Sequence, residues 1–224
     1  MALVTCKNIV KSFAGKRIID DVSFELNEGC FVSIMGRSGA GKSTLMRIIC
    51  GLIDADSGTV DVAGYRVDKL YGRQKTKFRS TIMGIVFQDS NLISDFNVED
   101  NILTPLYISG KKLDKAHYDK LLTLLEIKPY LKKMPSQISG GMRQRAAIAR
   151  ALIANPKVLF ADEPTGALDS KSEKEVMRLF TAINAEFGTS IIQVTHSDYC
   201  AQASKSIIRI NDGQISFQPS DGQV

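Results

Sequence analysis

The chain has 224 residues, 44% of them hydrophobic, so it can bury a sizeable core as one large domain or as a domain with an inserted lobe. It carries 29 Lys and Arg against 24 Asp and Glu, a net charge of +5, and no run approaches the roughly 18 consecutive apolar residues of a membrane span. The N-terminus lacks a basic, apolar, small-residue signal, so we expect a soluble protein that stays inside the cell.

The cysteines are far apart in the sequence and show no C-x-x-C spacing. We therefore expect reduced core thiols rather than disulfides or a zinc site. They are Cys6, Cys30, Cys50 and Cys200.

The first third of the chain is rich in strand patterns. Val22, Phe24 and Leu26 alternate with polar residues, as in a half-buried strand. Strands are expected over 2–10, 17–26, 30–35 and 58–62.

The apolar run from Phe31 to Met35 is followed by G-x-x-x-x-G-K-[ST], the pattern of a phosphate-binding loop. Its glycines allow turns whose N–H groups face a polyphosphate, Lys42 can reach the β- and γ-phosphates, and the Ser43 hydroxyl can ligate Mg²⁺. A buried helix over 45–50, stopped at Gly51, adds its N-terminal dipole to the anion site. The strand before and the helix after disfavour a chance glycine-rich turn. The loop residues are Gly36, Arg37, Ser38, Gly39, Ala40, Gly41, Lys42, Ser43 and Thr44.

Positive charges are clustered in two parts of the chain. A nucleic-acid surface, attraction to an anionic membrane leaflet or a membrane partner, and an ordinary solvated face are the three interpretations. Interspersed acidic residues and sparse aromatic residues favour the solvated face. The first cluster is Lys69, Arg73, Lys75, Lys77 and Arg79, and the second is Lys111, Lys112, Lys115, Lys128, Lys132 and Lys133.

Between about 97 and 155 the apolar residues change to a helical period. Those between 118 and 125 recur at helical spacing after an N-cap residue at Asp114, and Pro129 and Pro135 break the helices that follow. The stretch predicts an inserted helical lobe.

A short buried strand, Val158 to Ala161, ends in two carboxylates, Asp162 and Glu163. Functional groups of open parallel sheets collect at the carboxyl ends of strands, so both acids lie beside the phosphate loop if the two strands are neighbours. Asp162 can then hold Mg²⁺, directly or through water, and Glu163 is the candidate general base for the water that attacks the γ-phosphate. A solvated turn before Pro164 is the alternative, which the phosphate loop in the same chain disfavours.

The last part of the chain alternates helix and strand. Ser170 and Glu173 resemble a capping box that opens a helix ending at Gly188. Further strands are expected over 191–194 and 207–210.

A third motif, Ile138-Ser139-Gly140-Gly141-Met142, precedes the Asp-Glu strand by one helix. Ser139 is a natural N-cap, and the paired glycines let a helix N-terminus approach an anion closely. In this position the motif resembles the signature of ATP-binding-cassette (ABC) proteins, usually Leu-Ser-Gly-Gly-Gln. Ile138 and Met142 replace the first and last residues, which leaves the Ser and Gly pair intact and changes the contacts of the fifth position.

The resemblance covers essentially the whole chain and implies its fold. That fold is an α/β P-loop NTPase core of the ABC ATPase type, with an N-terminal antiparallel β subdomain and an inserted α-helical subdomain. By this likeness 89–155 form the helical subdomain, and 1–88 with 156–224 form the core and the β subdomain, in one nucleotide-binding domain of 1–224.

Four further positions take roles from the resemblance. Phe13 matches the aromatic residue that stacks on adenine, with core packing as the alternative. Gln88 matches the glutamine that joins the Mg²⁺ shell and links the site to the helical lobe. Asp169 matches the aspartate at the dimer seam, although a helix-entry cap also explains it. His196 matches the switch histidine that contacts the γ-phosphate.

The family also implies a mode of action. Two copies close head to tail around ATP and Mg²⁺, each phosphate loop facing the signature of the other copy, and hydrolysis reopens the pair. The motion passes to a separate integral membrane permease, so the chain is cytoplasmic and peripheral on the membrane, with no nucleic acid expected. Residues 89–108 are expected to dock a cytoplasmic helix of that partner, with packing inside the lobe as the alternative. The apolar residues behind this expectation are Leu92, Ile93, Phe96 and Val98.

Within the family, the chain resembles the group that serves lipoprotein release, macrolide export, antimicrobial-peptide resistance and FtsE-type cell division. The stretch 161–172 is most similar to the bacitracin-resistance type. The resemblance implies an ATP-hydrolysing motor subunit for export, extraction or resistance. A regulatory FtsE-like cell-division ATPase is one alternative. A nucleic-acid-linked ABC ATPase is the other, and the long coiled coil, zinc modules or second cassette typical of that class are not seen.

Overall fold

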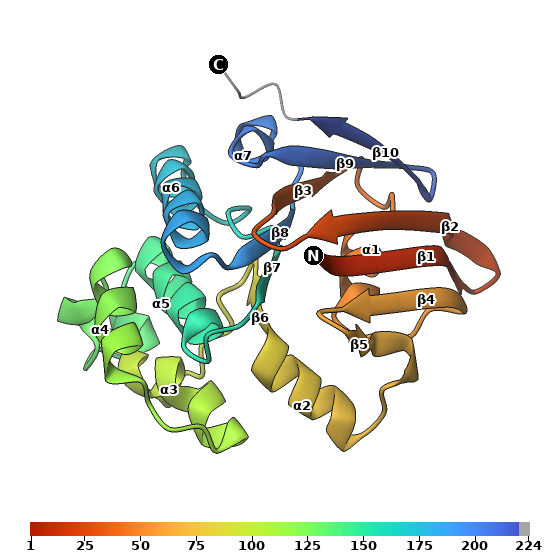
Figure 1. Ribbon diagram of the computed structural model, residues 1–224. Coiled ribbons are helices and arrows are strands. Elements are labelled where there is room, and N and C mark those ends of the chain that lie inside the picture. The colour runs from red at the N-terminus through yellow and green to blue at the C-terminus, as the bar shows by residue number, and fades with distance from the viewer. Residues whose placement is uncertain (220–224) are drawn as a thin grey trace.

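The computed structural model describes residues 1–219, which fold into two β-sheets and seven α-helices (Figure 1). The larger sheet has the strand order β10-β9-β3-β8-β7-β6 and is parallel except for β10, which pairs antiparallel with β9. Its central strands β3, β8 and β7 are buried at every position, as in a sheet covered on both faces. The strands are β3 (Phe31–Met35), β6 (Met83–Phe87), β7 (Val158–Asp162), β8 (Ser190–Val194), β9 (Ser206–Asn211) and β10 (Gln214–Pro219).

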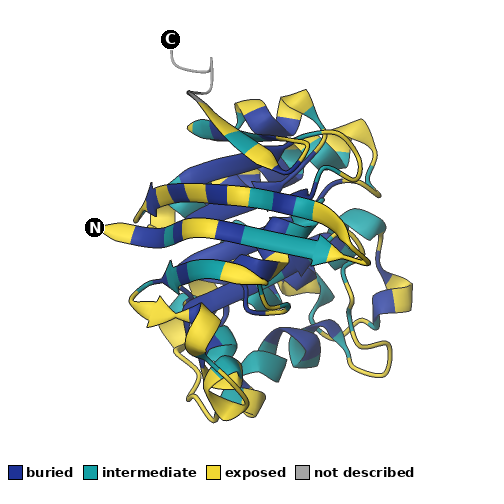
Figure 2. Ribbon diagram, turned by 90° about the vertical axis from the view of Figure 1, so that its right-hand side faces the viewer, coloured by how far each residue is buried: buried dark blue, intermediate teal, exposed yellow. Residues whose placement is uncertain are grey.

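The second sheet is antiparallel, with the order β2-β1-β4-β5. A tight turn at Ala14 and Gly15, both with positive φ, joins β1 to β2. Buried and exposed residues alternate along the second half of β2 (Figure 2), whereas register shifts interrupt the pattern in β1. One face of the sheet therefore covers the core and the other meets solvent. The strands are β1 (Ala2–Phe13), β2 (Lys16–Asn27), β4 (Ser57–Val62) and β5 (Tyr65–Arg66).

The helices lie on both sides of the larger sheet. α1 contacts strands of both sheets, whereas α3, α4, α5 and α6 gather on the other side of the larger sheet (Figure 1). No helix within residues 1–219 has the length and apolar content that crossing a membrane requires. The helices are α1 (Lys42–Ile49), α2 (Arg73–Ile82), α3 (Val98–Ser109), α4 (Lys115–Leu124), α5 (Gly140–Leu152), α6 (Ser170–Phe187) and α7 (Asp198–Gln202). Three short 3₁₀ turns are η1 (Val67–Lys69), η2 (Lys128–Tyr130) and η3 (Pro135–Gln137).

Two apolar cores lie on opposite faces of the larger sheet. Along β7, Val158 and Phe160 belong to the core shared with the antiparallel sheet and α1, whereas Leu159 and Ala161 belong to the helical core. A Cβ at Gly84 on β6 would collide with the Ala151 carbonyl oxygen on α5. The helices therefore pack directly on the sheet that carries the site.

Most of the expected elements are present, and the N-caps at Asp114 and Ser139 are confirmed by their side-chain hydrogen bonds to His117 and Met142 N–H groups. The helix begins at Ser170 as expected, but the capping box expected at Ser170 and Glu173 is wrong. Asp169 is the N-cap of α6, and its carboxylate accepts hydrogen bonds from the Lys171 and Ser172 backbone N–H groups. A carboxylate one residue earlier reaches both N–H groups, so it takes the place of the hydroxyl.

The cysteines are free thiols in the part of the chain that the structure describes, as expected. Cys6, Cys50 and Cys200 are buried, and Cys30 is half-buried. Burial raises the pKa of Cys6 to about 12 and that of Cys30 to about 11. Because the thiolate is the reactive form, these groups are nearly inert in the folded chain.

We expect an aromatic disulfide reagent at about pH 8 to modify the native chain slowly, with Cys30 first, and to modify all the cysteines rapidly once the chain is unfolded. Cys30 should react first because it is only half-buried and because its pKa is raised less than that of Cys6. Mass spectrometry of peptides sampled over time checks it. Modification of Cys6 or Cys50 before Cys30 in the native chain would contradict the described burial.

Candidate active site

The phosphate-loop residues connect the end of β3 to the start of α1. Gly41, at φ 100°, is the N-cap of α1, and a Cβ there would lie 2.8 Å from the Ile18 carbonyl oxygen. A Cβ at Gly36 would collide with the Ile210 carbonyl oxygen. Side chains at these two glycines would therefore push the loop away from the strands on either side.

The Lys42 side chain folds back over this loop. Its ammonium donates hydrogen bonds to the carbonyl oxygens of Gly36 at 2.9 Å and Arg37 at 3.1 Å, and the residue is only 8% exposed. Both partners are neutral, so a buried positive charge is held at the loop without a carboxylate beside it. Such a group attracts an anion strongly because little water screens it.

Asp162 at the end of β7 lies beside the loop, as expected, but the two strands that carry them are not neighbours. β8 pairs with both β3 and β7 and separates them. The contact is made by α1 instead, where the Ser43 hydroxyl donates to Asp162 Oδ1 at 2.7 Å. The Arg47 guanidinium, which sequence reasoning missed, lies 3.7 Å from Asp162 Oδ2.

A hydroxyl and a carboxylate at this distance are oxygen ligands of the kind that Mg²⁺ takes in combination with phosphate oxygens and water. No group of three or more His, Cys, Asp or Glu side chains suited to a metal occurs within residues 1–219. The pair of Ser43 and Asp162 therefore fits a metal that arrives with a polyphosphate better than a metal held by the protein alone.

Glu163 follows Asp162 in a left-handed conformation, at φ 50°. Its backbone N–H donates to the Val194 carbonyl oxygen at 3.0 Å, which ties the end of β7 to the end of β8. The His196 Nδ1–H donates to Glu163 Oε2 at 2.6 Å. Glu163 and His196, from two neighbouring strand ends, thus form a pair above the carboxyl edge of the sheet.

One cavity of about 360 Å³ is lined both by the phosphate loop and by Glu163. Phe13 lies at its rim, half exposed at 49%, which is more than a core residue shows and is compatible with a stacking surface. Ile18 on β2 also lines the cavity, and sequence reasoning missed it because only the fold brings β2 against the loop. The lining residues are Phe13, Ile18, Ser38, Gly39, Gly41, Lys42, Ser43, Thr44 and Glu163. Arg37 and Ala40 line an adjoining cavity with Ser38, Gly39, Lys16, Asn211 and Asp212.

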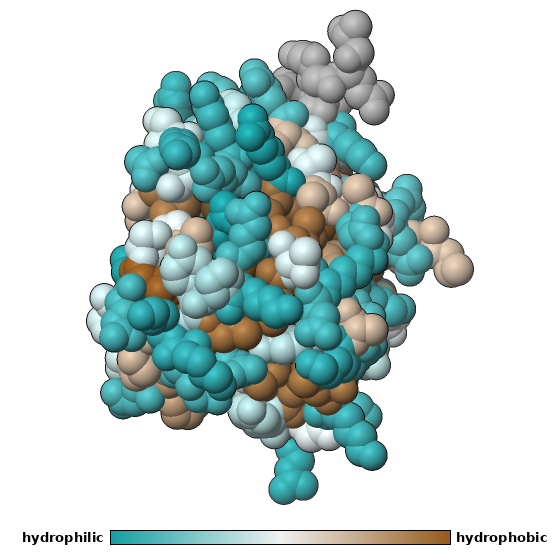
Figure 3. Space-filling view, turned by 90° about the vertical axis from the view of Figure 1, so that its left-hand side faces the viewer, coloured by the Kyte–Doolittle hydropathy of each residue, from teal (hydrophilic) through white to brown (hydrophobic). Residues whose placement is uncertain are grey.

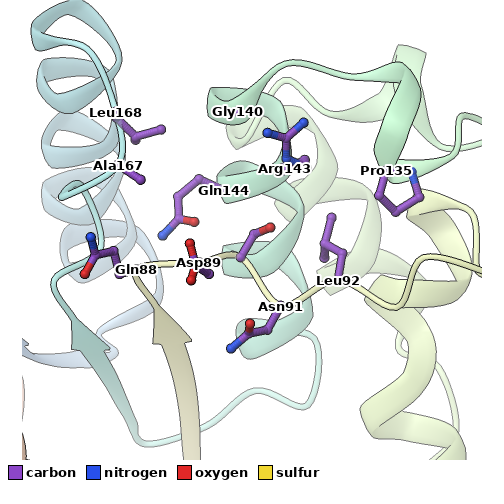
Figure 4. A pocket seen from close by; sticks show the side chains of 11 residues that line it. Gln88, Asp89, Asn91, Leu92, Pro135, Gly140, Arg143, Gln144, Ala167 and Leu168 are labelled. Carbon is purple, nitrogen blue, oxygen red and sulfur yellow. The ribbon is translucent and has the colours of Figure 1, made fainter.

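Gln88 lines a different cavity, of about 280 Å³, between the end of β6 and the first turn of α5 (Figure 4). A Cβ on Gly166 would lie 3.0 Å from Gln88 Nε2, so the side chain rests against the turn that follows Glu163. Gln144, to which sequence reasoning assigned no role, donates to the carbonyl oxygens of Phe87 at 3.1 Å and Pro164 at 2.8 Å. These two hydrogen bonds join α5 to the end of β6 and to the turn that follows β7.

The signature residues lie at the N-terminus of α5 and do not line the cavity around Lys42. The Ser139 hydroxyl accepts from the Met142 N–H at 3.3 Å, and Ser139 is exposed whereas Met142 is partly buried against the helical core. Gly140 lines the Gln88 cavity. A Cβ at Gly141 would meet only the Ser172 side chain, at 3.4 Å. The structure therefore does not bring this motif to the phosphate loop of its own chain.

Asp169 is exposed and caps α6 with its carboxylate, the alternative that the sequence left open. Hydrogen bonds from the Ser172 backbone N–H and hydroxyl lower the pKa of Asp169 below its usual range. The carboxylate is therefore ionised at neutral pH and holds the start of α6 beside the signature, since Ser172 also lies next to Gly141.

Comparison with known proteins places these features in a family. A family profile described as "ABC transporter" matches residues 19–166. The bacitracin export ATP-binding protein BceA of Halalkalibacterium halodurans is 36% identical over 99% of this chain and 90% of its own length. The lipoprotein-releasing system ATP-binding protein LolD of Porphyromonas gingivalis is 35% identical over 95% of this chain and 98% of its own.

The macrolide export ATP-binding/permease protein MacB of Syntrophobacter fumaroxidans is 42% identical over 92% of this chain, which spans 29% of that longer protein. Among solved structures, the ATP-binding cassette MJ0796, a dimer described as a post-hydrolysis state with ADP and Pi, matches with a TM-score of 0.87 and 34% identity. The match covers 98% of this chain and 100% of that one.

Proposed function

The chain belongs to the ABC transporter family as an ATP-binding, ATP-hydrolysing subunit, and from this membership we propose that it drives a separate integral membrane permease. One observation carries the assignment of the chemistry. A single cavity is lined both by the phosphate loop with Lys42 and Ser43 and by Glu163, and Asp162 is hydrogen-bonded to Ser43 at its edge. Anion binding and proton acceptance are therefore combined in one place.

In the proposed reaction, the loop N–H groups and the Lys42 ammonium bind the β- and γ-phosphates, while Phe13 offers a face for adenine. Glu163 accepts the proton of the attacking water. The hydrogen bond from His196 to Glu163 Oε2 holds the carboxylate in place. Positioning and charge neutralisation are most of what phosphoryl transfer requires of a protein.

We assign the metal to the edge formed by Ser43 and Asp162, with Gln88 reaching the shell from the end of β6. When bound there, Mg²⁺ neutralises charge on the phosphate oxygens. The hydrogen bond between the Ser43 hydroxyl and Asp162 keeps both oxygens on the same side of the loop before any metal is present.

The signature is proposed to act on a second copy of the chain. Ser139, Gly140, Gly141 and Met142 form a helix start, exposed at Ser139 and partly buried beyond it, that does not line the Lys42 cavity of its own chain. A helix N-terminus with free N–H groups is an anion site, and a head-to-tail partner offers the matching phosphate. Asp169 holds the adjoining start of α6 at the same seam. Two solved structures of the relative MJ0796, both dimeric, support this arrangement.

The relatives also narrow the proposed role. Their names describe bacitracin export, macrolide export and lipoprotein release. For this chain we propose work of that class, carried out from the cytoplasmic side of a membrane by a subunit that meets the membrane through its permease.

The proposed docking surface lies in residues 89–108. Val98 is fully buried and Leu92 partly buried, so for these two the alternative of packing inside the lobe applies. Ile93 and Phe96 are about 40% exposed, at 40% and 41%, and Tyr107 and Ile108 more so. Figure 3 shows apolar patches among the polar side chains of this helical side.

A buried asparagine holds the loop that carries Ile93 and Phe96. Asn101 accepts from the Ile93 N–H at 2.7 Å and donates to the carbonyl oxygens of Ile93 and Phe96, each at 3.0 Å. The loop shape therefore depends on backbone contacts and not on the two exposed side chains, and a rigid apolar surface binds a partner with little loss of conformational freedom.

The docking assignment predicts that Ile93→Ser with Phe96→Ser lowers copurification of the membrane partner by about tenfold or more, because aromatic anchors dominate such interfaces. ATP turnover of the isolated chain should stay unchanged. Quantitative pull-down from native membranes measures the first and phosphate release the second. Leu113→Ser is the matched control, since Leu113 is 41% exposed and lies outside the surface. Equal loss in the control, or no loss in the double variant, would reject this docking site.

A further inference from the structure

The segment that leads from β5 to β6 has an unusual charge. Residues 69–88 contain five basic side chains and no acidic one, since Asp68 and Asp89 are the nearest acids on either side. The proposed function gives these basic side chains no role. Its basic residues are Lys69, Arg73, Lys75, Lys77 and Arg79.

Two of the five fasten α2 to the rest of the chain. The Lys75 ammonium pairs with Asp54 at 2.5 Å, and the Arg79 guanidinium donates to the Gly51 carbonyl oxygen at 3.3 Å. Both contacts hold α2 against the turn that follows α1. These two charges are therefore accounted for by the fold.

The other three remain free to act on something outside the chain. Lys69, Arg73 and Lys77 are exposed, and none makes an ion pair within residues 1–219. Arg73 and Lys77 stand one turn apart on the face of α2 opposite the buried Phe78 and Ile82. Two like charges at this spacing weaken a helix slightly, so the fold itself gains nothing from them.

An aromatic side chain completes the surface. Tyr71 is 76% exposed and stands in the chain between Lys69 and Arg73. Tyrosine is favoured at membrane interfaces because its ring is apolar and its hydroxyl stays hydrated. We call Lys69, Tyr71, Arg73 and Lys77 the basic patch.

The basic patch lies next to the proposed docking surface. α2 contacts α3, and Figure 1 shows both helices along the lower edge of the molecule. α3 carries Tyr107 and Ile108, and the loop before it carries Ile93 and Phe96. If this edge meets a permease, as the proposed function holds, the patch beside it faces the surrounding lipid.

We propose that the basic patch binds the anionic phospholipid headgroups around the permease. The cytoplasmic leaflet carries a negative surface potential, and each Lys or Arg held near it adds to the attraction. The patch combines one face of α2 with Lys69 and the exposed Tyr71 just before the helix. A single aromatic residue with exposed apolar side chains alongside suits a lipid surface better than the stacked bases of a nucleic acid. It anchors the chain beside its partner without a membrane-crossing segment of its own.

The test is sedimentation of the full chain with vesicles of phosphatidylcholine alone or with about one third phosphatidylglycerol, at low salt. The chain should bind only the anionic vesicles and be released by about 0.5 M salt. The triple variant Lys69→Gln, Arg73→Gln, Lys77→Gln should partition about a hundredfold more weakly, since each charge contributes about a fivefold factor. Arg73→Lys should bind like the parent chain, because the attraction depends on charge and not on guanidinium geometry.

The control removes the same number of charges from another exposed helix. Lys171→Gln, Lys174→Gln, Arg178→Gln on α6 leaves the basic patch intact and should keep vesicle binding. Equal loss in this control, no binding of the parent chain to anionic vesicles, or tighter binding of the parent chain to duplex DNA at the same salt would each overturn the proposal. ATP turnover without lipid and copurification of the permease are measured on the same variants. A parent chain that neither turns over ATP nor copurifies a permease would contradict the proposed function and would leave the lipid binding untouched.

Discussion

Glu163→Gln is expected to bind ATP as tightly as the parent chain and to turn it over about 10²- to 10⁴-fold more slowly, because an amide keeps the shape of the carboxylate but cannot accept the proton of water. The amide oxygen can still accept the hydrogen bond from His196 Nδ1, so the pair that joins the ends of β7 and β8 is kept. Phosphate release measures turnover, and the fluorescence of a labelled ATP measures binding.

The control for this variant is another Glu→Gln change away from the cavity. Glu186→Gln removes one carboxylate at the far end of α6, where it pairs with Lys120 on α4. It should leave turnover unchanged. Parent-like hydrolysis in Glu163→Gln would remove the general-base assignment, and an equal loss of ATP binding would make the change structural.

The second large effect concerns the signature of one copy and the phosphate loop of the other. Gly141→Asp should abolish turnover, because it brings a negative charge to the helix start that we propose to face the partner's γ-phosphate. Lys42→Ala should abolish it by weakening phosphate binding. Mixing the two inactive chains should restore turnover, since each mixed dimer contains one site with an intact loop and an intact signature.

Gly141→Ala separates charge from bulk in this experiment. A Cβ at Gly141 would lie 3.4 Å from the Ser172 hydroxyl oxygen, an ordinary contact, so alanine should fit and keep most of the turnover. If the mixture of Gly141→Asp and Lys42→Ala chains stayed inactive while Gly141→Ala was active, each mutation would be disabling its own chain's site. The head-to-tail arrangement would then be wrong.

The site residues that could be predicted are those whose chemistry depends on local spacing. The phosphate loop is a continuous run between a strand and a helix, and Asp162 and Glu163 follow directly from the strand that carries them. The spacing of these motifs did not show how the phosphate loop and Asp162 come together. β8 lies between β3 and β7, and α1 brings Ser43 to Asp162 across that gap.

The residues that sequence reasoning missed act through contacts between distant segments. Ile18 enters the cavity from β2, Gln144 joins β6 to the turn after β7, and Asn101 shapes the loop at Ile93. None stands in a recognisable motif. The helix α2 was also missed, because only Phe78 and Ile82 are buried and its remaining residues give no apolar period. The basic residues of α2 belong to the same cluster on which the lipid-binding proposal rests.

The most direct test of the central claim, that Glu163 drives hydrolysis in a site closed by a second copy, is the sedimentation of Glu163→Gln in solution with Mg²⁺ and either ATP or ADP. We expect a dimer with ATP, because the closed pair cannot be reopened by hydrolysis, and a monomer with ADP. A variant that remained a monomer with ATP bound, or that formed the same dimer with ADP, would contradict it.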